Sequence, residues 1–417
     1  MKILQINTVY AIKSTGRTCA EVEQALAQMG HESCTAYGNG KKESSPNAYQ
    51  IDTKIEYLFH NFMSRLTGLE GYFSIFATLR LIKYIQKFQP DIIHLRNLHG
   101  HYLNFSILFN YLAKTKIPII QNLHDCWAFT GKCTYYTTIN CQKWKTECSN
   151  CPKMKEYPQS WFFDWSKKMR KNKEKWYSSL DNLTVVGVSD WVTNEAKMSF
   201  FSKAKNITRI YNWINMDVFH PYEYSDCLKE KYNIPKDKFM ILGVSSIWAS
   251  DTPRFEDFMY LAEHISDDMV LVMIGACRNN DLVDKNVVHI PFVDDTTELA
   301  RLYSSANVYI HCSREDTFGK VIAEALACGT PAVVYEITGC PEIVKEGCGF
   351  TVAPRDVNGI IKSINIIKSN GKENYTDNCL KNTFDNFNYQ NNIQQLIDLY
   401  LSLVVKKNES IQMKGDK

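Results

Sequence analysis

The sequence lacks a long, uninterrupted apolar segment. Its longest apolar run covers residues 269–277, far fewer than the roughly 20 residues that a helix needs to cross a bilayer. The opening residues 1–10 are interrupted by Gln5 and Asn7, so they predict a first β-strand and not a signal peptide. A membrane-spanning or secreted chain is therefore disfavoured, and we expect a cytoplasmic protein.

The sequence also lacks a marked excess of either charge. Its 417 residues hold 48 Lys and Arg against 45 Asp and Glu, a net charge of +3, which does not favour nucleic acid as a partner. Hydrophobic residues make up 45% and charged residues 22%, the usual balance of a globular protein. The chain is long enough for two or three domains, and a largely disordered or coiled-coil protein is excluded.

Short apolar runs alternate with longer amphipathic segments, a pattern typical of βαβ units on parallel sheets. No G-x-G-x-x-G motif follows the first predicted strand, which disfavours an NAD-dependent dehydrogenase. The predicted strands cover residues 2–6, 91–95, 118–123, 184–189, 239–245, 269–275, 287–290, 307–312 and 331–335, and helices are expected at 255–265, 296–305 and 320–328.

The alternating pattern pauses near residues 211–222 and then begins again. It predicts an α/β fold with two Rossmann-like, doubly wound domains that face a cleft. The expected parts are a first domain at 1–215 with an insertion at about 125–180, a second domain at 216–385, a helix at 386–405 that crosses back onto the first domain, and a flexible tail at 406–417.

The most informative motif follows the strand predicted to end at residue 312. Ligands bind outside the carboxyl ends of strands in open α/β sheets, and a helix beginning near Gly319 offers free N–H groups to a phosphate. Lys320 adds charge, and Asp316 and Glu324 are spaced to accept hydrogen bonds from sugar hydroxyls. The alternative is that Asp316 only caps the helix and Glu324 is a solvated surface residue.

The stretch 313–331 resembles the donor-binding signature of glycosyltransferase family 4, which are retaining enzymes of the GT-B fold. That signature has two acids eight residues apart, Phe-Gly between them and Glu-Ala-x-Ala-x-Gly-x-Pro after them. Here the acids are Asp316, in place of the usual Glu, and Glu324. Residues 338–344 (Thr-Gly-Cys-Pro-Glu-Ile-Val) match the family's next motif with one residue fewer.

The resemblance implies a role for each residue of this motif. Asp316 and the amides of Phe318 and Gly319 would hold the donor sugar and its diphosphate, beside Lys320. Glu324 would bind the nucleotide ribose. Asp316 is accordingly expected to be catalytic, and the others to bind the donor.

The segment after the first strand of the second domain departs from the family. Relatives carry an Arg and a Lys-Gly there, whereas Arg254 is the only basic residue in 248–258 and Asp251 has the opposite charge. Arg254 is expected to contact the diphosphate. The departure makes a non-catalytic sugar-binding or partner subunit with a degenerate donor site the alternative hypothesis.

Two motifs of the first half also lie at predicted strand ends. Capsule and exopolysaccharide members of the family carry a loop similar to residues 14–17 (Ser-Thr-Gly-Arg), which implies donor contacts for Gly16 and Arg17; an ordinary turn is the alternative.

His124 and Asp125 follow a buried strand, where a His can donate to a sugar hydroxyl or orient a leaving group. The resemblance places this pair near the donor sugar, so both are expected to be catalytic. His99 is the second choice, and a buried structural His is the alternative.

Four cysteines crowd into the expected insertion: Cys133, Cys141, Cys148 and Cys151. Four thiolates suit a tetrahedral, structural Zn²⁺, although only the last pair has the compact ligand spacing. Free packing thiols are the alternative, and disulfides are disfavoured in a reducing cytoplasm. No metal or other cofactor is expected for catalysis.

A basic segment with aromatic ends covers residues 165–176, close to Trp161, Phe162 and Phe163. Such a segment is either a solvated face or a peripheral contact with an anionic membrane on the inner face of the plasma membrane.

The resemblance implies a retaining glycosyltransferase. It would move a hexose-type sugar from a UDP- or GDP-linked donor, held by the second domain, to a saccharide acceptor on the first. The acceptor would be lipid-linked and belong to a bacterial surface polysaccharide. A nucleotide-sugar 2-epimerase of the same fold is a further alternative.

Overall fold

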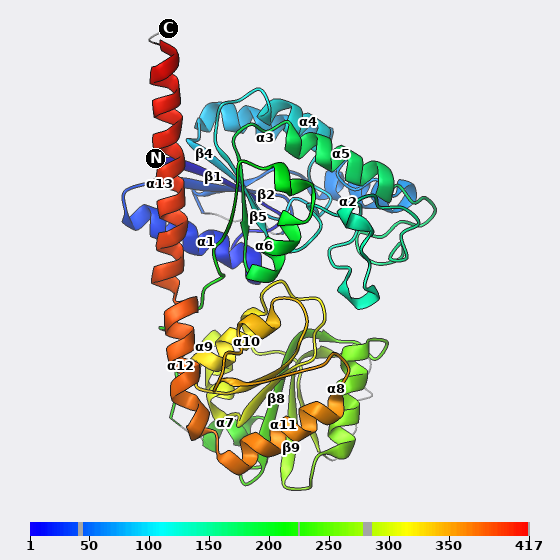
Figure 1. Ribbon diagram of the computed structural model, residues 1–417, viewed down its shortest axis with the longest axis vertical. Helices are drawn as coiled ribbons and strands as arrows, with labels where there is room; N and C mark the ends of the chain where they lie inside the picture. The colour runs from blue at the N-terminus through cyan, green and yellow to red at the C-terminus, as the bar shows by residue number, and fades with distance from the viewer. Residues whose placement is uncertain (41–44, 224–225, 278–285, 416–417) are drawn as a thin grey trace. The chain divides into compact units, whose positions relative to one another are not determined.

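The computed structural model describes residues 1–40, 45–223, 226–277 and 286–415. The chain forms two compact units, one of Met1–Ile210 with Ile393–Lys417 and the other of Tyr211–Asn392 (Figure 1). Within the described ranges, no helix combines the length and the apolar character needed to span a bilayer.

The first unit is built on a seven-stranded parallel sheet in the order β3-β2-β1-β4-β5-β6-β7. Its central strand explains the polar residues that interrupt the first apolar run. Ile3, Leu4 and Ile6 are fully buried, and Gln5 is buried too, because its side chain bonds to the Cys19 carbonyl and to Arg96. The strands are β1 (Lys2–Asn7), β2 (Glu32–Tyr37), β3 (Ala48–Gln50), β4 (Ile92–Leu95), β5 (Ile119–Leu123), β6 (Leu183–Gly187) and β7 (Asn206–Arg209).

Helices cover both faces of this sheet, with α1 on one side and α3 and α4 on the other (Figure 1). The start of α2 has a clear local cause, since Thr53 and Glu56 form a reciprocal capping box. The helices are α1 (Lys13–Gln28), α2 (Lys54–Thr67), α3 (Ile75–Phe88), α4 (Phe105–Leu112), α5 (Ser166–Ser178) and α6 (Asp190–Lys197), with 3-10 turns η1 (Thr137–Ile139), η2 (Lys143–Lys145) and η3 (Phe200–Lys203).

The last helix, α13 (Tyr389–Gly415), ends in the first unit. Tyr400 is fully buried there, and its hydroxyl lies 2.7 Å from Nδ1 of His94. Residues 406–415, where the sequence predicts a flexible tail, continue α13, and no Gly or Pro interrupts the helix before Gly415. Residues 416–417 lie outside the described part of the chain.

The second unit holds a six-stranded parallel sheet in the order β10-β9-β8-β11-β12-β13. Its strands are β8 (Phe239–Trp248), β9 (Met269–Cys277), β10 (Val287–Ile290), β11 (Val308–His311), β12 (Ala332–Tyr335) and β13 (Gly349–Val352). Its helices are α7 (Asp226–Lys231), α8 (Pro253–His264), α9 (Thr296–Ser305), α10 (Lys320–Ala327), α11 (Val357–Asn370) and α12 (Glu373–Phe387), with a 3-10 turn η4 (Cys340–Glu342).

The strand order of each sheet reverses once, between β1 and β4 and between β8 and β11. The carboxyl ends of strands at such a switch point border the crevice where doubly wound folds bind ligands. The turns after β1 and β4, and those after β8 and β11, therefore mark the two places at which to look for sites. The prediction of two doubly wound α/β domains is confirmed.

Candidate functional site

The N-terminus of α10 is open toward the switch point of the second sheet. Gly319 is its N-cap residue with φ of +78°, and no side chain of the described residues caps the helix. A Cβ at Gly319 would come within 2.7 Å of Cδ1 of Ile322, besides straining the left-handed backbone. The first N–H groups of α10 and the half-buried Lys320 are thus free to meet an anion.

Phe318 fixes the loop that leads into α10. Its side chain is buried, with ring centroids 6.0 Å from Tyr211 and 5.3 Å from Phe387. The ring therefore anchors the loop in the core of the second unit. Only the backbone of Phe318 remains for a ligand, as the predicted role of its amide requires.

Asp316 is held as a carboxylate by a histidine that the sequence analysis did not identify. Nε2 of His311, the last residue of β11, lies 2.8 Å from the Asp316 carboxylate. Burial alone would raise the pKa of Asp316, but the hydrogen bond and charge of His311, with smaller contributions from Ser313 and Arg254, lower it to about 2. The Asp316 carbonyl also accepts a hydrogen bond of 3.3 Å from the Gly339 amide, which links the two recognised motifs.

Glu324 lies on the second turn of α10 and is half-buried. Its carboxylate accepts a hydrogen bond of 3.4 Å from the hydroxyl of Tyr303, a buried residue of α9. A carboxylate can accept hydrogen bonds from several donors, ribose hydroxyls among them.

Arg254 lies near Asp316, on the first turn of α8. Its guanidinium donates 3.2 Å to the Ile247 carbonyl and stacks 5.5 Å from the Trp248 ring. Its positive charge contributes to the low pKa of Asp316. The strand β8 continues to Trp248, beyond the predicted end at residue 245, so this segment is more ordered than a free loop.

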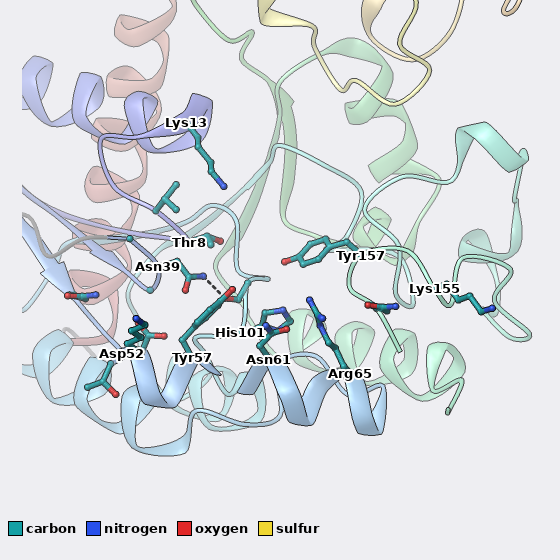
Figure 2. Close-up of a pocket in the computed structure, with 18 residues that line it drawn as sticks. Thr8, Lys13, Asn39, Asp52, Tyr57, Asn61, Arg65, His101, Lys155 and Tyr157 are labelled. Atoms are coloured by element: carbon teal, nitrogen blue, oxygen red, sulfur yellow. Dashed lines mark hydrogen bonds between the residues drawn. The ribbon is translucent and has the colours of Figure 1, made fainter. Parts of the chain in front are cut away.

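The first unit contains a cavity of 740 Å³ at its own switch point (Figure 2). Its wall comes from the turns after β1 and β4, from one face of α2, and from residues 155–159 of the expected insertion. We call it the first-unit pocket. The capping box of Thr53 and Glu56 was the sequence signal that would have located α2, and with it this wall.

Four cationic side chains line the first-unit pocket: Lys13, Lys54, Arg65 and Lys155. Figure 2 shows Lys13 and Arg65 pointing into the cavity from opposite sides. Tyr57 and Tyr157 also border it, and Nδ2 of Asn39 donates 2.6 Å to the Gly100 carbonyl at its base. The pocket therefore combines positive charge with hydrogen-bonding groups and aromatic faces, which suits an anionic saccharide derivative.

Two buried oxygens in this pocket have no hydrogen-bond partner among the described residues, Oδ2 of Asp52 and Oδ1 of Asn61. Burial, with the nearby charge of Glu56, raises the pKa of Asp52 to about 8. At neutral pH this carboxyl is therefore mostly protonated and can donate a hydrogen bond. Unpaired buried polar groups are costly unless a ligand or water completes them.

A buried charge pair supports the base of the pocket. The Glu70 carboxylate pairs with the ring of His101 and accepts the amides of Gly100 at 3.0 Å and His101 at 2.9 Å. Burial alone would raise the pKa of Glu70, but the charge and hydrogen bonds of His101 hold it well below its usual range. His60 lies near enough to complete a three-ligand cluster, yet its Nε2 accepts the Gly71 amide and burial lowers its pKa to about 4. Hydrogen bonds and the Glu70–His101 pair account for the close approach of these three side chains.

His124 and Asp125 bond to different partners. The Asp125 carboxylate lies 2.6 Å from Nε2 of His99, and Nδ1 of His99 lies 2.9 Å from the Tyr157 hydroxyl. Both residues lie in the bends that follow β5, and their side chains have different partners. His99, the second choice from sequence, is the histidine connected through Tyr157 to the first-unit pocket.

His124 is a neutral hydrogen-bonding residue. Its Nε2 lies 2.9 Å from Nδ2 of Asn122 and 3.3 Å from Nε of Arg96. Both neighbours supply N–H groups, so Nε2 accepts and the ring proton is assigned to Nδ1. Burial, and then the charge of Arg96, lower the pKa of His124 well below its usual range. His124 is thus unsuited to carry a positive charge.

Gly16 and Arg17 lie within α1 and not in a loop before it. A Cβ at Gly16 would lie 3.1 Å from both the Ala11 nitrogen and Cγ2 of Val9, so this position packs closely against the turn after β1. Arg17 is exposed, whereas Lys13 of the same helix lines the first-unit pocket. The residues that match the family's loop therefore form the first turns of α1.

The four clustered cysteines all lie in the described chain with free thiols. Their sulfur atoms are not among the groups of three or more described ligand atoms that fall within 4.8 Å of one another. Burial, and then the charges of Cys151 and Cys148, raise the pKa of Cys133 to about 12. These two thiols therefore lie near Cys133. The residues around them, 126–165, form only the 3-10 turns η1 and η2 as regular structure.

Comparison with known proteins identifies the family. Residues 15–218 match the family described as Glycosyltransferase Family 4, and residues 228–384 match Glycosyl transferases group 1. A protein of Escherichia coli (strain K12) named as a colanic acid biosynthesis glycosyl transferase, WcaC, is 23% identical over 371 residues, covering 86% of this chain and 88% of that protein.

Two further similarities bear on the fold and the substrates. The UDP-Gal:alpha-D-GlcNAc-diphosphoundecaprenol alpha-1,3-galactosyltransferase of Escherichia coli is 25% identical over 214 residues, covering 48% of this chain and 55% of that enzyme. The structure of Anabaena Alr3699/HepE in complex with UDP-glucose superimposes with a TM-score of 0.66 at 12% identity, covering 96% of this chain and all of that one. The chain belongs to glycosyltransferase family 4 and is a glycosyltransferase of the GT-B fold.

Proposed function

We propose that this glycosyltransferase retains anomeric configuration while transferring a hexose-type sugar from a UDP- or GDP-linked donor to a saccharide acceptor. The observation that carries the proposal is the open N-terminus of α10, with Asp316 and Arg254 nearby and Glu324 one turn further on. This arrangement combines an anion site with two carboxylates for sugar and ribose hydroxyls. The bound UDP-glucose in the structural relative supports a nucleotide sugar as the donor.

The proposed reaction needs little covalent chemistry from the protein. The bond between the anomeric carbon and the donor phosphate breaks, and a bond from the same carbon to the acceptor oxygen forms on the same face. The acceptor proton passes to the leaving phosphate oxygen. Lys320, Arg254 and the α10 amides stabilise the charge that develops on the diphosphate, which is where preorganised dipoles have the largest effect.

The first-unit pocket is the proposed acceptor site. Its cations suit a diphosphate, and its hydroxyl, amide and protonated carboxyl groups suit sugar hydroxyls. A relative that uses a diphosphoundecaprenol-linked acceptor supports a lipid-linked saccharide. We accordingly place the protein in the cytoplasm, at the inner face of the plasma membrane, and in surface polysaccharide synthesis, as the name of the WcaC relative suggests.

Nucleoside diphosphate release, measured with a panel of UDP- and GDP-sugars, tests this function. We expect release that depends on a saccharide-diphosphate-lipid acceptor, and an α-linked product from an α-linked donor. Binding without release would favour a partner subunit, and release without acceptor would favour an epimerase. The variant Lys13→Ala/Arg65→Ala should raise the acceptor KM about tenfold or more while sparing donor affinity, because each charge-assisted hydrogen bond contributes about 1.5–3 kcal/mol.

A matched control for this charge removal lies in the second unit. Lys362 and Lys381 are exposed lysines of α11 and α12, so Lys362→Ala/Lys381→Ala removes the same charge away from the pocket. An acceptor KM that rises equally in both variants would contradict the assignment of the first-unit pocket.

We also propose that Cys133, Cys141, Cys148 and Cys151 hold one structural Zn²⁺. The support is electrostatic: Lys132 and Lys173 are buried beside the thiols, and their ammonium groups donate to main-chain carbonyls. Burial lowers the pKa of Lys173 to about 7, whereas the nearby Cys133 and Cys148 act to raise it. Four zinc-bound thiolates would supply the negative charge that buried lysines require.

Metal analysis of protein purified under reducing conditions should find one zinc per chain. Cys148→Ser/Cys151→Ser should lose the metal and lower the melting temperature, because a structural site contributes directly to folding. Cys227→Ser, at an exposed cysteine of the second unit, is the control and should keep both. Native protein that contains no zinc, or a double Ser variant with the melting temperature of the native protein, would refute the site.

A further inference from the structure

The helix α2 has two chemically different faces. Tyr57, Asn61 and Arg65 recur at helical spacing and line the first-unit pocket. Another face carries largely exposed apolar side chains: Ile55 is 79% exposed, and Leu58, Phe59 and Phe62 are all more than half exposed. An amphipathic helix in a soluble fold normally turns its apolar face inward, so this arrangement requires an explanation.

Two neighbouring segments extend the same apolar exposure. The first turns of α3 expose Ile75, Phe76 and Leu79, with Phe76 73% exposed. The residues before α5 expose Trp161, Phe162, Phe163 and Trp165.

Direct contacts join the three segments into one surface. The Phe62 ring lies 6.0 Å from the Trp161 ring, and the Trp161 amide donates 2.8 Å to the Arg65 carbonyl. Arg80 of α3 donates 2.5 Å to Glu56 of α2. We call this surface, formed by residues 55–62, 75–79 and 161–165, the apolar surface. It is larger than the scattered apolar residues that monomers ordinarily expose.

Positive charge surrounds the apolar surface. Residues 54–88 and 161–178 together hold eleven Lys and Arg against four Asp and Glu, a formal charge of +7 in a chain whose total is +3. Of these charged residues, Arg170, Lys173 and Glu70 are buried, and Glu56 is paired with Arg80. Lys168 lies 5.1 Å above the Trp165 ring. Basic side chains beside exposed Trp, Phe and Leu are the composition that inserts into an anionic lipid surface.

We propose that the apolar surface docks onto an anionic lipid bilayer, with Phe and Trp side chains entering the headgroup region. Docking to a bilayer goes beyond the proposed function. Its consequence for the acceptor rests on the proposal that the first-unit pocket is the acceptor site. Because α2 carries two of the pocket cations, Lys54 and Arg65, on one face and the apolar side chains on another, docking would place the first-unit pocket beside the lipid headgroups. A carrier-linked diphosphate could then be bound while its lipid stays in the bilayer.

Vesicle flotation tests the docking without any enzymatic readout. We expect the native protein to float with vesicles of phosphatidylcholine and phosphatidylglycerol, and less with phosphatidylcholine alone. The variant Phe59→Ser/Phe62→Ser/Phe76→Ser should lose about tenfold or more in vesicle partitioning, because each side chain contributes buried apolar area. These positions are exposed, so the fold should survive, as circular dichroism would verify.

The matched control removes equally exposed apolar side chains from the second unit. Tyr260, Phe292 and Phe384 are 39%, 70% and 58% exposed, and Tyr260→Ser/Phe292→Ser/Phe384→Ser should float like the native protein. Lys167→Glu/Lys168→Glu/Lys171→Glu should weaken binding only to the anionic vesicles.

Three outcomes would overturn the docking proposal. These are native protein that does not float, a triple Ser variant that floats normally, and a native oligomer that this variant dissociates, which would identify a protein interface instead. Turnover of a short, soluble acceptor separates this test from the proposed function. The triple Ser variant should keep that turnover, and a native enzyme that floats yet turns over no acceptor would refute only the function.

Discussion

Replacing His124 with alanine is expected to lower transfer by roughly 10²–10³-fold, the effect of removing one preorganised hydrogen-bond donor from a reacting centre. The hypothesis from the sequence is that this ring, which is neutral, donates to a sugar oxygen. Nucleotide affinity should stay nearly unchanged, because the nucleotide is assigned to the second unit. Single-turnover transfer rates and calorimetric titration with the nucleoside diphosphate measure the two quantities separately.

Removing His124 also deletes the acceptor of Arg96 Nε and Asn122 Nδ2, so folding must be checked. His124→Gln restores an amide oxygen near that position and should recover stability with little recovery of rate. His264, an exposed residue of α8 that bonds to its own helix, provides the control His264→Ala. If nucleotide affinity fell as much as the rate, His124 would not act on the sugar.

Glu324→Ala is expected to weaken binding of the free nucleoside diphosphate by roughly tenfold or more. If Glu324 accepts both ribose hydroxyls, the change deletes charge-assisted hydrogen bonds that contribute about 1.5–3 kcal/mol each. Calorimetry with the nucleotide and with the nucleotide sugar measures the loss. Glu346→Ala, which removes an exposed acid from the same unit, is the control and should leave affinity unchanged.

Two neighbouring variants separate the parts of the donor. Asp316→Ala should spare the free nucleotide and impair the intact nucleotide sugar, because its partner is the hexose. Arg254→Ala should weaken both and reduce the salt dependence of binding, because Arg254 carries the positive charge of its segment. If all three variants bound and turned over the nucleotide sugar like the parent, the sugar-binding or partner-subunit hypothesis would replace the proposed function.

Regular hydrophobic periodicity allowed elements of the second unit to be predicted from its sequence. The strand at Val287–Ile290 and the helix at Thr296–Ser305 have the predicted bounds, because each is a short apolar run or a complete amphipathic repeat. β2 and β13 were missed. The sequence of β2, Glu-Ser-Cys-Thr-Ala-Tyr, is too polar to stand out, and its burial depends on pairing with β1.

The donor motif could be read because it is local. Asp316, Phe318, Gly319 and Glu324 belong to one turn and the helix that follows it, so their spacing alone brings them together. His311, which holds Asp316 ionised, lies only five residues earlier. It gave no signal, because a histidine at a strand end is equally typical of a structural role.

The sequence by itself determined the α/β class, the two doubly wound domains, the family and the residues of the α10 turn. These depend on periodicity and on spacings of a few residues, which the backbone converts directly into position. Only the tertiary structure decided that Asp125 pairs with His99 instead of His124, that Lys13 and Arg65 share a pocket with Asp52, and that α2 exposes an apolar face. Each of these features depends on residues from separate elements. The sequence alone does not show which elements the sheet order brings together.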